Sequence, residues 1–292
     1  MTRPCLKGQN HRRASAAFSL LEVMVAVALL AVIIVGLLAM FYQVQRAFRA
    51  GTSQGDLMEH GRTVLNLFAR ELQEAAASRF PGPNTGDRSI VTNLAVVPSV
   101  SPAGAALLSA TSFQELSNSE QRENFLKDIF FLSRQNDDWI FTAYRLSNAV
   151  SGVGTLYRLV ARDTTNNPAF LSGALSTATP YNNTNFHRLV DGVVHFYVEA
   201  YDHKGLIMTN AWTTAFPGNY GFTNEVMPAY LDIELGVLEP STFERFKARA
   251  ESDPDQVTFS TVKGQYLSKK AGRVQLFRQR VPLRGPASDA GY

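Results

Sequence analysis

The sequence predicts an α+β protein in which one long N-terminal helix packs on an antiparallel β-sheet. Two observations predict this fold. An apolar run near the N terminus leads into a stretch without proline, where apolar residues recur at helical steps. Further along the chain the pattern changes to short aromatic and β-branched segments with turn residues between them, which is typical of strands.

The composition is that of an ordinary folded chain of 292 residues, with 45% hydrophobic and 18% charged residues. This length allows one medium domain with an extension, or two small domains. Four basic residues precede the first acid, Glu22, so the net charge of +3 belongs to one end and gives no reason to predict nucleic-acid binding. The single cysteine, Cys5, excludes an internal disulfide, and we expect no metal or other cofactor.

The apolar run covers residues 23–42, reads VMVAVALLAVIIVGLLAMFY and contains no charge. A helix of this length rises roughly 30 Å, which is enough to cross a bilayer, so we expect residues 18–42 to form a transmembrane helix. A buried core helix is the alternative, although such helices usually carry a polar face. More basic residues precede the run than follow it, which predicts a cytoplasmic N terminus and a periplasmic C-terminal domain, if the cell has a periplasm.

Glu22 lies at the edge of this apolar run, where a carboxylate costs a few kcal/mol unless it is paired. One interpretation is that Glu22 marks the headgroup boundary. The other is that a cut after Ala17 creates a new amine at Phe18, one helical turn from Glu22, and that staggered neighbouring chains pair amine with carboxylate. A secretory signal peptide is a further alternative, but its small-residue cleavage site follows the apolar run, and here the small residues 14–17 precede it.

The segment from Ala17 to Val23 (AFSLLEV) resembles the processing site of type IV pilins and type II secretion pseudopilins. The resemblance covers about the first 45 residues. It implies that prepilin peptidase cuts between Ala17 and Phe18, that the Phe18 amine is methylated, and that Glu22 directs assembly with other pilins in the inner membrane. Residues 1–17 would then be a basic leader that is removed together with Cys5. The family usually has glycine where this chain has Ala17.

Residues 43–80 are predicted to continue the helix as an amphipathic segment. Its apolar face has three- and four-residue spacing and comprises Leu57, Val64, Leu65, Phe68, Leu72 and Ala76, while Arg70, Glu71 and Glu74 are assigned to the polar side. Glycines at 51, 55 and 61 weaken the middle, so two helices with a loop near residues 51–55 are an alternative. The Pro81-Gly82-Pro83-Asn84 sequence ends the helix.

Residues 81–283 are predicted to form one periplasmic α+β domain, followed by a polar tail at 284–292. We expect strands at 128–132, 139–146, 155–161, 189–201, 229–237 and 274–281. Between these strands we expect a loop at 81–125 with a short helix near 119–127, a hairpin connection at 147–154, a polar loop at 172–185 and a turn at 202–205. A capping-box pattern at Ser241 predicts a short helix from 241 to about 250.

Between Leu189 and Leu235 the order of residue types is similar to that of J-type minor pseudopilins, and also to that of W-type minor pilins. The pattern comprises Leu-Val-Asp-Gly-Val, Tyr201–Gly205, Trp212 and Met227–Leu235. This resemblance implies a minor structural subunit of a secretion pseudopilus or a pilus. The sequence does not discriminate between the two systems.

No nucleophile-elbow, P-loop or zinc-protease motif is present, and we expect a protein that is not an enzyme. His195 is interpreted as a packed or surface residue rather than a base. The acidic pairs at 137–138 and at 253 and 255 are interpreted as solvated turns, with weak calcium binding as the alternative. Two other functions stay open: a signal-anchored periplasmic binding protein that does not polymerise, and a secreted hydrolase with an uncleaved signal.

Overall fold

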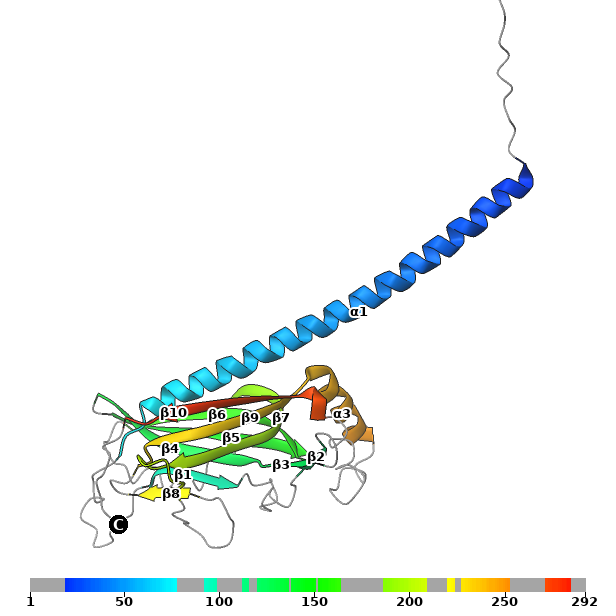
Figure 1. Cartoon of the computed structure of the whole chain (residues 1–292). Helices are drawn as coiled ribbons and strands as arrows, with labels where there is room; N and C mark the ends of the chain where they lie inside the picture. Colours follow the sequence, from blue (N-terminus) through cyan, green and yellow to red (C-terminus); the bar gives the residue numbers. More distant parts are fainter. Residues whose placement is uncertain are drawn as a thin grey trace, which may run out of the picture. The chain divides into compact units, whose positions relative to one another are not determined.

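The computed structural model describes residues 19–77, 92–98, 112–115, 120–136, 138–150, 152–163, 186–208, 220–223, 227–252 and 271–284. The chain divides into two units, Met1–Thr52 and Ser53–Tyr292. In the second unit the C-terminal part of the first helix packs on a large sheet, which confirms the expected α+β class (Figure 1). Several expected features lie outside the described residues: the leader at 1–17, the Pro81-Gly82-Pro83-Asn84 sequence, the 172–185 loop, Trp212, the acids at 253 and 255, and all but the first residue of the polar tail.

The first helix, α1, runs without interruption from Leu20 to Gln73. Gly51 and Gly55 lie inside it, so the alternative of two helices joined by a loop is wrong. The helix ends before residue 80, where we expected its end. Ala75 instead forms an antiparallel bridge with Ser133 of the sheet, and the Ala76 N–H donates to the carbonyl of Leu132 at 2.9 Å. The sheet therefore provides hydrogen bonds that replace the last helical turn.

The expected apolar face of the C-terminal part of α1 is the face that the sheet covers. Phe68 is at its centre and packs edge-on against Tyr144, with ring centroids 4.4 Å apart. Phe131 and Phe196 lie at 6.3 and 5.9 Å from the same ring. The buried residues of the helix are Leu57, Gly61, Val64, Leu65, Phe68, Ala69 and Leu72.

The main sheet has eight strands in the order β10-β9-β7-β6-β5-β4-β1-β8, and each of its strand pairs is antiparallel. Its strands are β1 (Thr92–Pro98), β4 (Lys127–Gln135), β5 (Asp138–Val150), β6 (Val153–Asp163), β7 (Phe186–Tyr201), β8 (Tyr220–Thr223), β9 (Tyr230–Leu238) and β10 (Val274–Pro282). A separate pair comprises β2 (Ser112–Glu115) and β3 (Gln121–Asn124). All six expected strands are confirmed, most of them longer than expected.

The region expected to be a loop contains β1, and the expected short helix near 119–127 is wrong. Gln121–Asn124 is β3, and Lys127 begins β4. The connection between them must be extended, because Leu126 forms a parallel bridge with Phe196 and the Phe125 carbonyl accepts the Phe196 N–H at 2.7 Å. Packing on the large sheet thus overrides the local helical preference.

Two other boundaries differ from the sequence prediction. Helix α3 runs from Pro240 to Ser252, and the Glu239 carbonyl accepts the N–H groups of Thr242 and Phe243. Ser241 therefore lies inside the helix rather than capping it, with proline at the first helical position, where its missing N–H has no cost. Strand β5 runs to Val150 and β6 begins at Val153, so the β5–β6 connection is shorter than expected, and Gly152 there has a φ of 77°.

Candidate assembly segment and its supporting domain

Ser19 forms the N-cap of α1. The Glu22 N–H donates to both the side-chain oxygen of Ser19, at 3.2 Å, and its carbonyl oxygen, at 3.0 Å. A serine in this position satisfies one of the free N–H groups at a helix start and fixes where the helix begins. Glu22 consequently lies in the first turn, where its negative charge interacts favourably with the helix dipole.

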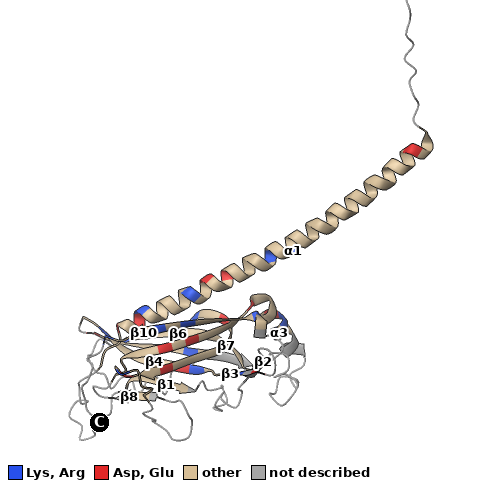
Figure 2. Ribbon diagram, in the orientation of Figure 1, with Lys and Arg blue, Asp and Glu red and all other residues tan. Residues whose placement is uncertain are grey.

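The part of α1 in the first unit exposes an almost unbroken apolar surface. Figure 2 shows this half of the helix nearly free of charged residues apart from one acidic position near its start, which is Glu22. The exposed fraction is 78% for Leu20 and still 68% for Tyr42. The helix is long and apolar enough to cross a membrane, and its most apolar window is not buried in the protein. An exposed surface of this kind must be covered by lipid or by other apolar helices.

Glu22 has no cationic partner along its own helix. The next basic residue is Arg46, twenty-four residues later, which corresponds to ~36 Å along the helix axis. A carboxylate in an apolar environment is costly unless a positive charge lies near it. Such a charge must come from outside this helical segment, either from the chain N-terminal to Ser19 or from another molecule.

The structure places only one of the three predicted site residues. Glu22 is exposed in the first turn of the helix. Ala17 and Phe18 lie outside the described residues, so the expected cut site and methylation site stay predictions. His195, which we interpreted as packed or on the surface, is buried at 4% exposure.

A largely buried carboxylate fixes the C-terminal part of α1 to the sheet, and the sequence analysis missed it. Glu71 accepts the Tyr144 hydroxyl at 2.5 Å and the Arg158 Nε at 3.1 Å, and Arg158 Nη2 forms a second bond to it. Only 13% of the Glu71 side chain and 25% of the Arg158 side chain are exposed. The assignment of Glu71 to the polar side was therefore wrong. Burial, with the bonded Glu71 beside it, raises the pKa of Tyr144 far above its ordinary value.

His195 is held by the backbone of the β3–β4 connection. Its Nδ1 accepts the Phe125 N–H at 3.1 Å, and its Nε2 lies 3.4 Å from a carboxylate oxygen of Glu234. Burial, together with nearby arginines and Lys127, lowers the pKa of His195 to about 3. A histidine that is neutral and serves as a backbone acceptor is suited to a structural role.

Charged pairs cross β9 and β10 on the face opposite α1. Arg278 bonds Glu234 at 3.0 Å, and Arg280 binds Asp232 through two bonds of 2.7 Å. Each arginine is directly opposite its acid in the strand register. Among the residues that the structure describes, no group of three or more His, Cys, Asp and Glu side chains could hold a metal ion.

Together these features define a class of protein. Such a protein has one N-terminal apolar helix, which fits a single-pass membrane anchor, and this helix continues into an α+β domain. Residues 12–38 match the family described as the prokaryotic N-terminal methylation motif. This motif is the type IV pilin-like signal, so the match supports the pilin and pseudopilin family and implies processing by prepilin peptidase and assembly with other pilins. A search of curated proteins found no similar sequence.

Proposed function

We propose that this chain is a minor pilin or pseudopilin, a structural subunit rather than an enzyme. It is made as an inner-membrane precursor with its C-terminal domain in the periplasm. The match of residues 12–38 to the N-terminal methylation motif carries the proposal. The exposed apolar helix, which has one acid near its start, supports it. The resemblance of residues 189–235 favours a J-type pseudopilin or a W-type pilin within that family.

In this proposal prepilin peptidase cuts between Ala17 and Phe18, and the new amine of Phe18 is methylated. Glu22 is then the fifth residue of the mature chain. The amine of an incoming subunit and the Glu22 carboxylate of its neighbour neutralise each other in lipid, where an unpaired charge would be costly. This pairing sets the stagger of one helix on the next, while the apolar residues on either side of the pair provide the contact area.

Mass spectrometry of the membrane-extracted protein tests the processing step. We expect a chain that begins at Phe18 and carries a methyl group on its amine. An intact Met1, or a cut after residue 42, would refute the proposal. The second result would instead identify a secreted protein that discards its apolar segment.

Cysteine crosslinking in the membrane tests assembly, because the mature chain is expected to be free of native cysteine once Cys5 is removed. A single cysteine placed in the exposed apolar part of α1 should form crosslinks to neighbouring subunits. We expect Glu22→Ala to abolish them while membrane localisation is retained. Glu59→Ala is the matched control, since Glu59 is an exposed acid on the same helix. Crosslinks that survive Glu22→Ala would refute the role of Glu22, and their absence when Glu22 is intact would favour an anchored binding protein that does not polymerise.

A further inference from the structure

Strand β10 is an end strand of the main sheet, and within the described part of the chain β9 is the only strand bonded to it. Two bonds at its ends define its register. The Glu239 N–H donates to the Arg273 carbonyl, and the Leu283 N–H donates to the Ala229 carbonyl, both at 2.9 Å. Pairing between these points is regular, so the odd-numbered residues of β10 exchange hydrogen bonds with β9.

The even-numbered residues therefore turn their backbone groups away from β9. Leu276, Arg278 and Arg280 present N–H and C=O groups along the outer edge, in the spacing that an added antiparallel strand requires. Pro282 is the next residue in this series and has no N–H, so the row of donors ends there. The edge is thus long enough for a short extended segment. Pro282 limits how far such a segment can pair at the C-terminal end of β10.

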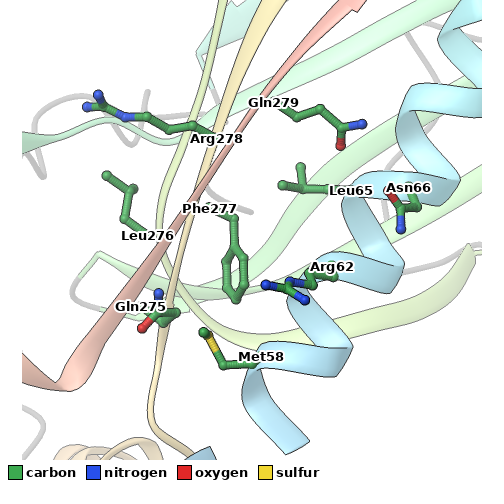
Figure 3. Close-up of a pocket in the computed structure, with 9 residues that line it drawn as sticks. All are labelled: Met58, Arg62, Leu65, Asn66, Gln275, Leu276, Phe277, Arg278 and Gln279. Carbon is green, nitrogen blue, oxygen red and sulfur yellow. The ribbon is translucent and has the colours of Figure 1, made fainter. Parts of the chain in front are cut away.

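A cavity of about 290 Å³ opens beside the same edge, between β10 and α1. Five consecutive residues of β10, Gln275–Gln279, border it, so it extends along the strand rather than behind one side chain. Figure 3 shows Met58 and Arg62 of α1 reaching toward Phe277, while Arg278 lies on the other side of the strand. A strand added to β10 would direct every second side chain into this cavity.

The charges of the sheet indicate which segment would fit. On the face opposite α1, β9 contributes the acids Asp232 and Glu234, and β10 contributes the bases Arg278 and Arg280. Acids on a further strand would continue this alternation, because directly opposite charges stabilise a strand pair. Exposed Arg62 adds positive charge at the cavity. A second copy of β10 would bring these arginines together, and we therefore disfavour it as the occupant.

We propose that the outer edge of β10 binds an extended acidic segment of a partner protein by strand addition. Backbone bonds to Leu276, Arg278 and Arg280 hold the segment. Its acidic residues lie opposite the two arginines, and the apolar residue between them, which lies opposite Gln279, enters the cavity. Strand addition of this kind draws affinity from the backbone bonds and specificity from the pocket. The proposal uses residues of α1 only from Met58 onward, so its failure would leave the role proposed for Glu22 unaffected.

Fluorescence anisotropy with the full chain in lipid nanodiscs tests the proposal. One probe is a labelled, end-capped peptide in which valine alternates with glutamate, and the other replaces each glutamate with lysine. We expect the glutamate peptide to bind at least tenfold more tightly than the lysine peptide. Leu276→Pro removes an outward N–H without breaking a bond to β9, and it should weaken binding at least tenfold.

Arg62→Gln provides a second variant that leaves the sheet unchanged, and it should weaken binding about threefold. Arg245→Gln is the matched control, since Arg245 is an exposed arginine on α3, and it should leave binding unchanged. Equal affinity for the two peptides would overturn the proposal, as would unchanged binding in Leu276→Pro with a native circular dichroism spectrum. Self-association that Leu276→Pro abolishes, with no peptide bound, would overturn it in favour of a second copy.

Discussion

Replacing Glu71 with alanine tests how the C-terminal part of α1 is held on the sheet. The change removes the acceptor of the Tyr144 hydroxyl and leaves Arg158 without its acid. A hydrogen bond to a charged group contributes about 1.5–3 kcal/mol, and breaking a fully buried ion pair costs about 3–5 kcal/mol. Because the two side chains are 13% and 25% exposed, the cost should lie between these ranges, at about 2–4 kcal/mol.

Thermal unfolding of the full chain in detergent measures this loss, with tryptophan fluorescence as the signal, because Trp139 is only 2% exposed. For a domain of this size we expect a fall in Tm of roughly 5–15 °C. Glu74→Ala is the matched control, an exposed glutamate one turn further along the chain, and it should change stability by less than about 0.5 kcal/mol. A double-mutant cycle with Arg158→Met isolates the pairwise energy. A loss below about 0.5 kcal/mol for Glu71→Ala would refute the reasoning.

Two further predictions, one for Gly61 and one for His195, have outcomes of defined sign. Gly61→Ala should destabilise the protein by about 1–3 kcal/mol in denaturant unfolding, because the added Cβ would lie 2.3 Å from the Phe277 ring. Gly55→Ala, with nothing within 4 Å, should stabilise it by up to about 1 kcal/mol, and equal effects at the two sites would contradict this packing. His195, with a pKa of about 3 when folded, should cause stability to fall as pH drops below about 6.5, by up to about 1.4 kcal/mol per pH unit. His195→Gln keeps a side-chain acceptor for the Phe125 N–H, and it should flatten the acid limb of the stability curve; identical slopes in both proteins would show that another group is responsible.

The strands that the sequence predicted are those with long aromatic and β-branched runs, such as β7 and β9. The unpredicted strands have weaker local patterns. β1 has the polar Asn93 among its buried residues, and β8 has only four residues, which are held by their pairing with β1. A strand of four residues carries too little periodicity to be distinguished from a loop, so its existence depends on a neighbour distant in sequence.

The candidate assembly segment, which comprises Ser19, Glu22 and the apolar run at 23–42, was predictable because its signal is local. The apolar run and Glu22 can be identified within about twenty-five residues, and α1 presents them as expected. Glu71 could have been identified from its spacing, since it follows Phe68 by three residues on the face that the apolar pattern defines. A charge at such a position indicates a buried pair, but its partner Arg158 is 87 residues away and no local rule names it.

The order of strands in the sheet differs from their order in the chain, and this has a consequence for how the domain folds during synthesis. Gly61 of α1 rests against Phe277, which belongs to β10, the last strand in the part of the chain that the structure describes. The opposite margin is completed by β8, which appears more than a hundred residues after its partner β1. Both edges of the main sheet, β10 and β8, are therefore completed only after late segments of the chain have been synthesised. An emerging chain can close the central β4–β5–β6 hairpins early, but the surface that α1 packs on is complete only after β10 has been synthesised.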